Sequence, residues 1–384
     1  MSHFLVVRIL INFTLVAGFF TSCNAPDSKQ FYSEEANRTP LVLDYAKRFQ
    51  AWTYGGIIEI KVNAGSQSPD TITYILIPRG TEGHHHLAAD HIIEVPVQKL
   101  VVTSTSHIPS LSLLGISETL VGFPNTEYIS SPEIRKRTDQ GLVQNVGDAN
   151  GLNFESLIAL QPELVMTYLS GADRSELQQL DQSGIPYVLN FDFMEEAPLG
   201  RTEWIKFIGL LVGKTKQADS VFDVIENKYQ TLQRTTSNLT LKPTVFSGIL
   251  YGDTWFAPGA NSFAAKLIED AGGAYSWSDL KSSGSVELSL EAVMDRNSIT
   301  DFWIGPGDYT TKAALFQADP RNAHFQAFQK DQVYNSHGRI GSAGGFEYFE
   351  LAGARPDLVL GDLISIFHPE FLPDHELYFY QKLD

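Results

Sequence analysis

Short apolar runs alternate with helical stretches from about residue 100 to the C-terminus. The runs are rich in β-branched and aromatic residues and are listed here in chain order: LVVTSTS (100–106), TLVGF (119–123), PELVMTYL (162–169), IPYVLNF (185–191), TVFSGILY (244–251) and ITDFWIG (299–305). Apolar strands separated by helices predict parallel sheets with right-handed crossovers. We therefore expect an α/β fold with two Rossmann-like lobes, one over residues 96–198 and one over residues 239–384.

A long helical segment separates these two lobes. Residues 201–236 contain no proline, and apolar residues fall on one face of a helix at offsets 0, 4, 7, 11 and 14. These residues are Ala218, Phe222, Ile225, Tyr229 and Leu232. A helix of this length would span roughly 50 Å. We predict that residues 199–238 form one rigid inter-lobe helix that permits only limited lobe motion.

Residues 41–95 have the pattern of a small antiparallel sheet. Ile58, Ile60 and Val62 alternate with other residues, and the preceding Gly-Gly pair suits a tight hairpin. We therefore expect an N-terminal β-hairpin extension before the first lobe. His84, His85, His86 and His91 follow the strands, and we expect them in a solvated loop, because consecutive loop residues rarely converge on one metal ion.

The N-terminus has the pattern of an export signal. Residues 9–20 are a continuous apolar run, too short to span a bilayer, which takes about 20 residues, but typical of a secretory signal. Thr21 and Ser22 precede Cys23 and resemble the lipobox of bacterial lipoproteins. We expect a signal peptide at 1–22, lipidation of Cys23 and a polar tether at 23–40. An ordinary signal peptide with an incidental cysteine is the alternative.

Charge and composition exclude several classes of protein. With 45 acidic and 28 basic residues among 384, the net charge is −17, which is unsuited to a nucleic-acid binder. A single cysteine allows no internal disulfide and no thiolate metal site. Gly213-Lys214-Thr215 lacks the spacing of a phosphate-binding loop, and no Gly-x-Ser-x-Gly elbow occurs. A periplasmic enzyme is therefore the least supported alternative.

Several candidate ligand-binding residues follow the predicted strands. Ser104 and His107 come directly after a buried strand, where side chains of parallel sheets face a ligand crevice. A histidine that bonds locally at a helix start is the other interpretation of His107. Eight aromatic residues lie in or beside Gly-, Ser- or Pro-rich turns, where aromatic faces can line a cleft: Tyr128, Tyr168, Trp255, Phe256, Trp277, Tyr309, Phe346 and Tyr348.

Four stretches give the sequence a family resemblance. They are VVTSTSHIPSLSLLGISETLVG (101–122), the segment from Val146-Gly147 through NFESL (153–157) to QPELV (161–165), PGANS (258–262) with AGG (271–273), and residues 286–293 with PDLVLGDLISIFHP (356–369). Together they resemble a substrate-binding lipoprotein of an ABC importer. The class is the one with a helical backbone that binds cobalamin, ferric siderophores or haem.

The resemblance implies a non-enzymatic, monomeric receptor with its ligand between the lobes and no cofactor. It places the ten candidate residues near that ligand. It also implies an ABC permease and ATPase as partners, docked through one acidic residue of each lobe. Gln144 and Asn261 stand where the family commonly has glutamate, so we assign docking to Glu133 and Glu269. The implied location is the bacterial cell envelope, anchored to the membrane by lipid only and facing the periplasm.

The sequence leaves the ligand open. Convergent arginines would suit an anionic siderophore, and the candidate turns contain few of them. This favours a large, mostly neutral ligand such as a corrinoid, with a ferric siderophore next. Haem and a zinc or manganese ion on the same fold are further alternatives.

Overall fold

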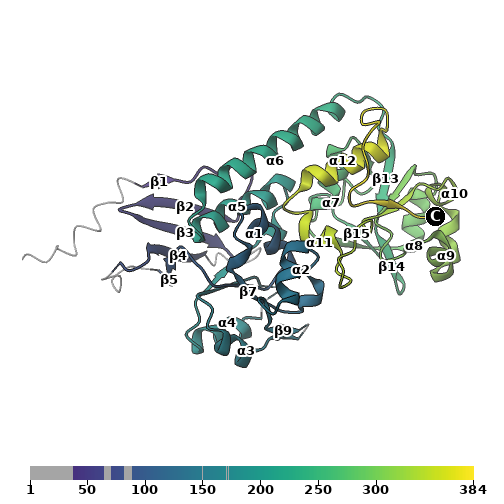
Figure 1. Ribbon diagram of the computed structural model, residues 1–384. Coiled ribbons are helices and arrows are strands. Elements are labelled where there is room, and N and C mark those ends of the chain that lie inside the picture. Colours follow the sequence, from purple (N-terminus) through teal and green to yellow (C-terminus); the bar gives the residue numbers. More distant parts are fainter. Residues whose placement is uncertain (1–37, 65–70, 82–88, 149, 170, 172) are drawn as a thin grey trace, which may run out of the picture.

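The structure is a computed structural model that describes residues 38–64, 71–81, 89–148, 150–169, 171 and 173–384. Two α/β lobes lie side by side, and an additional sheet lies at the far end of the first lobe (Figure 1). Cys23 and the histidines at 84–86 lie outside the described residues.

The first lobe is built on a parallel sheet of strand order β12-β11-β6-β7-β8. Its central strands are buried on both faces, as expected for a sheet covered by helices. The strands are β6 (Leu100–Val102), β7 (Leu120–Phe123), β8 (Gln144–Asn145), β11 (Leu164–Thr167) and β12 (Tyr187–Leu189). The helices are α1 (Ile108–Leu113), α2 (Pro132–Asp139), α3 (Phe154–Leu160) and α4 (Ser175–Gln182). A short ribbon, β9 (Gly147–Asp148) with β10 (Gly151–Leu152), adjoins them.

The second lobe repeats this plan with the strand order β16-β13-β18-β19-β20. All pairs are parallel except β19 with β20. The strands are β13 (Thr244–Ser247), β16 (Ala274–Tyr275), β18 (Phe302–Ile304), β19 (Val333–Asn335) and β20 (Gln381–Lys382). The helices are α7 (Phe263–Asp270), α8 (Leu290–Asn297), α9 (Lys312–Ala318), α10 (Gln326–Gln329), α11 (Glu347–Leu351) and α12 (Pro356–Phe367).

The second lobe also contains an antiparallel sheet that the sequence pattern did not predict. It consists of β14 (Ile249–Tyr251), β15 (Thr254–Pro258) and β17 (Ser285–Ser289). The run at 244–251 is therefore two strands, separated at Gly248, rather than one.

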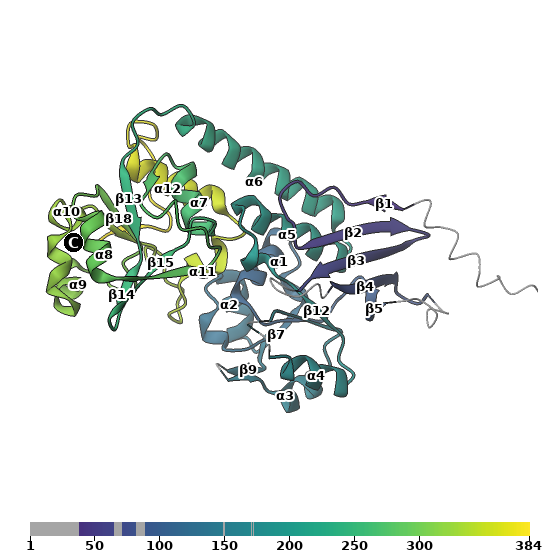
Figure 2. The same ribbon diagram turned by 180° about the vertical axis from the view of Figure 1, so that it is seen from behind.

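The inter-lobe connection is not the single helix that was predicted for residues 199–238. It is two helices, α5 (Pro198–Leu211) and α6 (Thr215–Thr236), and Gly213 between them has φ of 68°, which helical residues do not adopt. The predicted stripe on α6 is confirmed, with Leu232 only partly buried. The 22 residues of α6 span about 33 Å, and the helix packs against α5 and α12, so it contacts both lobes (Figure 2).

The N-terminal extension is a five-stranded sheet of β1 (Thr39–Pro40), β2 (Phe49–Tyr54), β3 (Ile57–Asn63), β4 (Thr71–Pro78) and β5 (His91–Val95). It is antiparallel as predicted, except that β5 pairs with β4 in parallel. His91 therefore lies in a strand rather than in a loop, and its ring contacts those of Tyr74 and Tyr187.

This sheet shares its hydrophobic core with the first lobe. Phe49 packs against Trp204 with ring centroids 4.7 Å apart, and the backbone N–H of Leu189 donates to the Tyr74 hydroxyl. The buried carboxylate of Glu203 accepts backbone N–H groups from residues 44–46 at 2.8 to 3.0 Å. The extension and the first lobe are thus one packed body.

Candidate functional site

A pocket of about 540 Å³ opens at the carboxyl ends of β6, β7 and β11. Its walls come from the loops after these strands, together with β9, β10 and the start of α4, and its described lining residues all fall within 103–177. This is the edge where ligands of parallel α/β sheets bind, and the volume suits a small organic ligand. The pocket is therefore the candidate ligand site of the first lobe.

Three of the predicted ligand residues line this pocket together. They are Ser104, Tyr128 and Tyr168. Tyr128 is 54% exposed and Tyr168 is 37% exposed, so both rings present a face to solvent. The Tyr168 ring packs edge-on against Phe193 at 5.5 Å, which limits its freedom before any ligand arrives.

The pocket wall is acidic, a feature that the sequence analysis missed. Asp148, Asp173 and Glu176 line it, and none of its described lining residues is lysine or arginine. The backbone N–H of Ser175 donates to Asp173 at 2.8 Å and lowers the pKa of that carboxyl. Glu176 accepts the backbone N–H of Leu152 at 2.9 Å. The wall offers acceptors for N–H donors and repels anions.

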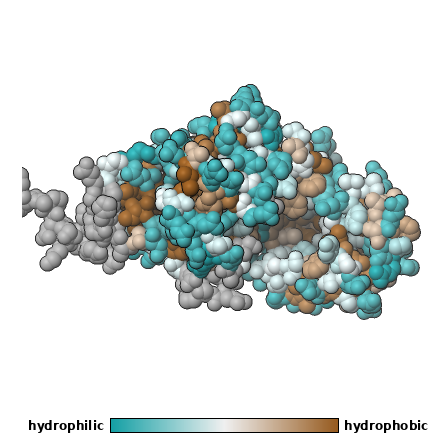
Figure 3. Space-filling view, turned by 90° about the horizontal axis from the view of Figure 1, so that it is seen from below, coloured by the Kyte–Doolittle hydropathy of each residue, from teal (hydrophilic) through white to brown (hydrophobic). Residues whose placement is uncertain are grey.

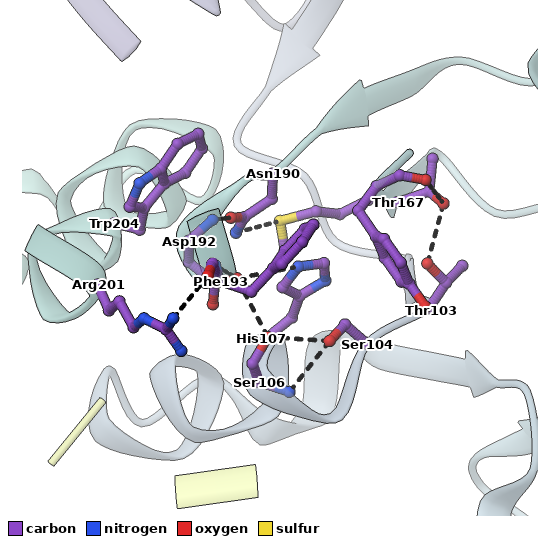
Figure 4. A network of polar contacts seen from close by, with 12 residues as sticks. Thr103, Ser104, Ser106, His107, Thr167, Asn190, Asp192, Phe193, Arg201 and Trp204 are labelled. Atoms are coloured by element: carbon purple, nitrogen blue, oxygen red, sulfur yellow. Dashed lines mark hydrogen bonds and ion pairs between the residues drawn. The ribbon is translucent and has the colours of Figure 1, made fainter. Parts of the chain in front are cut away.

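Below the pocket, a polar network supports the turn after β6 (Figure 4). The Thr103 hydroxyl donates to Thr167 at 2.9 Å, which joins the ends of β6 and β11. The Ser106 hydroxyl donates to Asp192 at 3.2 Å. These bonds hold the Ser104 loop in place beneath the pocket.

His107 lies inside this network rather than on the pocket surface. It is 0% exposed, and burial lowers the pKa of its imidazole, an effect that the nearby Asp192 opposes. Its Nε2 lies 4.0 Å from an Asp192 oxygen, and neither ring nitrogen has a hydrogen-bond partner among the described residues. In this conformation His107 supports the site from below and does not contact the pocket.

The second lobe brings Phe346 together with a histidine that the sequence analysis missed. The ring of His337 stacks on Phe346 with centroids 4.0 Å apart, and its Nε2 lies 3.6 Å from Asp308. Burial lowers the pKa of His337, and Asp308 opposes this. His337 follows β19 as His107 follows β6. Its position after a buried strand could therefore have marked it as a candidate in the sequence.

Tyr309 and Tyr348 lie near this pair but pack into the second lobe. Asn335 donates its side-chain amide to the backbone carbonyl of Tyr309. The Tyr348 ring contacts Phe379 and Tyr380 edge-on. Both tyrosines are partly buried against the core of the second lobe. They lie outside the first-lobe pocket.

The structure places the remaining aromatic candidates elsewhere. Trp255 is 0% exposed and packs among Phe246, Trp303 and Phe325, because it lies on the inward face of β15. Trp277 is also buried, and the Arg296 guanidinium covers its ring at 4.7 Å. Phe256 lies on β15, where it pairs with Ile249 and Glu287. In this conformation none of the three reaches the pocket.

The lobes meet beside the pocket. The Glu350 carboxylate of α11 accepts the N–H and hydroxyl of Ser130 at 2.7 and 2.9 Å and the N–H of Ser131 at 3.0 Å. A Cβ on Gly345 would overlap the backbone of Tyr128, so glycine permits this close approach. Viewed from below, the molecule has a hollow between the two lobes with hydrophobic residues in it (Figure 3). The pocket rim at Tyr128 therefore borders the second lobe.

The two predicted docking residues are on different lobes. Glu133 is exposed near the start of α2. Glu269 is on α7, where Lys266 forms an ion pair with it at 3.0 Å. Their role in docking stays a prediction.

No described helix combines the length and apolar character needed to cross a membrane. Among the described residues there is also no group of three or more His, Cys, Asp or Glu side chains placed to hold a metal ion.

Two α/β lobes, a helical connection and a pocket at the strand ends define a two-lobed ligand-binding protein. Residues 100–340 match the model of the periplasmic binding protein family, and the chain belongs to this family. The resemblance noted in the sequence is thus confirmed. As a member of this family, the protein is a binding protein rather than an enzyme.

Relatives and solved structures agree with this assignment. An uncharacterized lipoprotein of the archaeon Methanocaldococcus jannaschii is 25% identical over 94% of this chain and 93% of its own length. A second lipoprotein of that organism is 24% identical over 76% of this chain and 70% of its own. A periplasmic haem-binding protein of Pseudomonas aeruginosa has a TM-score of 0.57 and 17% identity, covering 75% of this chain and 98% of that one. A possible iron-binding protein of Staphylococcus epidermidis has a TM-score of 0.54 and 21% identity, covering 71% and 98%.

Proposed function

We propose that this protein captures a corrinoid, or a ferric siderophore without net negative charge, and delivers it to an ABC permease. The observation that supports this most is the first-lobe pocket, in which Tyr128 and Tyr168 stand beside three carboxylates. Aromatic faces suit a large flat ligand, and carboxylates accept hydrogen bonds from amide N–H groups. A corrinoid carries such amides around its ring.

The same wall argues against anionic ligands. Haem carries two propionates and catecholate siderophores are polyanions, so both need cationic partners, for which arginine is best suited. The described lining of the pocket supplies neither lysine nor arginine. A corrinoid is larger than 540 Å³, so we expect this pocket to hold one side of it and the second lobe to cover the other.

Isothermal titration calorimetry on the chain from residue 24, which keeps every described element, tests the ligand class. The titrants are cobalamin, haem, a neutral ferric hydroxamate and a ferric catecholate. We expect binding of cobalamin or the hydroxamate and none of the catecholate. Tighter binding of haem or the catecholate than of both other ligands would contradict the proposal.

Tyr168→Ala tests the site itself. Loss of one aromatic face should weaken binding about 5- to 30-fold. Tyr251→Ala is the matched control, because Tyr251 is an exposed tyrosine on β14 outside the pocket. Equal ligand affinities of the two variants would show that Tyr168 is not part of the binding site.

We also propose that Cys23 anchors the chain to a membrane and that Glu133 and Glu269 dock the permease. The relatives named as lipoproteins support the anchor, although they are archaeal, so the bacterial envelope stays a prediction. Cys23→Ser should move the protein from the membrane fraction to the soluble fraction. Glu133→Lys and Glu269→Lys should reduce uptake in cells while ligand affinity is unchanged.

A further inference from the structure

A second cavity of the described structure is separate from the ligand pocket. It measures about 900 Å³ and lies between α6, the segment 194–199 that leads into α5, the turn before β2, and α7. The two cavities have no described lining residue in common. One wall belongs to the body formed by the extension and the first lobe, and the α7 wall belongs to the second lobe.

Four cationic side chains line this cavity. Lys47 and Arg48 come from the turn before β2, Arg234 from the end of α6, and Lys266 from α7. They converge from three elements in a chain whose net charge is −17. This arrangement contrasts with the first-lobe pocket, where the described lining has carboxylates and no cation.

Three carboxylates line the cavity, from Glu195, Glu196 and Asp270, and two of them are already engaged in hydrogen bonds. Glu195 accepts the backbone N–H groups of Lys47 and Arg48 at 2.9 to 3.1 Å, together with the Trp204 indole N–H. Asp270 accepts the Tyr229 hydroxyl at 2.6 Å and a Gln233 amide at 2.9 Å. These bonds hold Glu195 and Asp270 against the protein, so these two compete weakly for the nearby cations. With the exposed Glu196 included, the described lining has four cations and three carboxylates.

Three of the four cations form no ion pair within the described part of the chain, whereas Lys266 forms an ion pair with Glu269 at 3.0 Å. Among the described residues, no carboxylate lies within ion-pair distance of the side chains of Lys47, Arg48 or Arg234. Arg48 donates its Nε to the Met194 carbonyl at 3.3 Å, which holds the guanidinium at the cavity wall. Arg234 contacts the Thr231 hydroxyl.

We propose that this cavity is a second binding site, for a small organic or inorganic anion with several carboxylate or phosphate groups. The volume fits a molecule of this size, and cations from three elements match several anionic groups at once. An anion held by Lys47 and Lys266 together would tie the N-terminal body to the second lobe. This site is independent of the ligand in the first-lobe pocket.

Calorimetric titration of the chain from residue 24 with citrate and with pyrophosphate tests the site. At low salt we expect a dissociation constant below about 1 mM for at least one of them. Lys47→Glu and Arg234→Glu should each weaken binding about 5- to 30-fold. Lys228→Glu is the control, because Lys228 is exposed on the same helix as Arg234 but outside the cavity.

Two results would overturn the proposal. One is no binding of either anion at low salt. The other is an equal loss of affinity in Lys47→Glu, Arg234→Glu and Lys228→Glu, which would indicate only a general charge effect. Circular dichroism of each variant confirms that it is folded, and all three side chains are exposed, so folding should be unaffected.

Discussion

The two lobes share a sheet plan but use their aromatic residues differently. In the first lobe, Tyr128 and Tyr168 lie in loops beyond the strands and reach the pocket. In the second lobe, Trp255 follows β13 and β14 but lies on β15 of the additional antiparallel sheet, which turns its ring inward. An aromatic residue in a glycine-rich turn after a strand can therefore line a ligand site or fill a core. The difference depends on whether the turn is a loop or a hairpin.

The sharpest test of this comparison is the stability of Trp255→Ala against Tyr168→Ala. Trp255→Ala should lower the unfolding free energy by about 3 to 5 kcal/mol, because removal of the buried indole leaves a large cavity. Tyr168→Ala should lower the unfolding free energy by only about 0.5 kcal/mol or less, because the side chain is partly exposed. Denaturant unfolding measures both, and similar losses for the two variants would refute the assignment.

Glu350 tests the contact that joins the lobes. Its carboxylate accepts three hydrogen bonds from the first lobe, and Glu350→Ala leaves those buried donors unpaired. We expect a loss of about 1 to 3 kcal/mol. Glu347→Ala, a neighbouring carboxylate that bonds Tyr378 within the second lobe, is the control for charge. A smaller effect of Glu350→Ala than of the control would show that the contact is unimportant.

The two histidines after β6 and β19 give a pH test. Burial lowers the folded-state pKa of both His107 and His337, so the unfolded chain takes up the proton first as pH falls. The neutral rings therefore stabilise the folded state above pH 6.5, and this contribution to the unfolding free energy is lost as pH falls below 6.5. The loss is up to about 1.4 kcal/mol per pH unit for His107 and smaller for His337, which solvent screens more.

Replacing each histidine in turn separates the two contributions to the pH dependence of the unfolding free energy. His107→Gln and His337→Gln should each flatten the dependence of unfolding free energy on pH between 7 and 5. A wild-type stability that rises as pH falls through this range would contradict the burial of the neutral rings.

The smallest expected effect lies at the boundary between the extension and the first lobe. Arg79 pairs with Glu163 at 2.8 Å, but both side chains are partly exposed. Arg79→Ala should lower the unfolding free energy by about 0.5 kcal/mol, and by less at high salt, as measured by denaturant unfolding. A loss above about 2 kcal/mol would mean that the pair is more protected from solvent than its exposure indicates.

The lobes were predictable because their strands are short, apolar and separated by helices. The break in the connector was not, because no proline interrupts residues 201–236 and both helices pack apolar residues against the core. Only Gly213 marked it. The acidic wall was also missed, because Asp148 on β9 is about 25 residues before Asp173 and Glu176 at the start of α4, and the two segments converge only in the folded lobe.

The shared core of the extension has a consequence for the order of folding. The donors at 44–46 and the hydroxyl of Tyr74 have their partners at Glu203 and Leu189, which are 157 to 159 and 115 residues later in the chain. The strands of the extension cannot complete these contacts until residue 203 has been synthesised. Long-range contacts of this kind slow folding. The extension is therefore translated before its partners and completed late, which leaves its strands exposed to chaperones and proteases in the meantime.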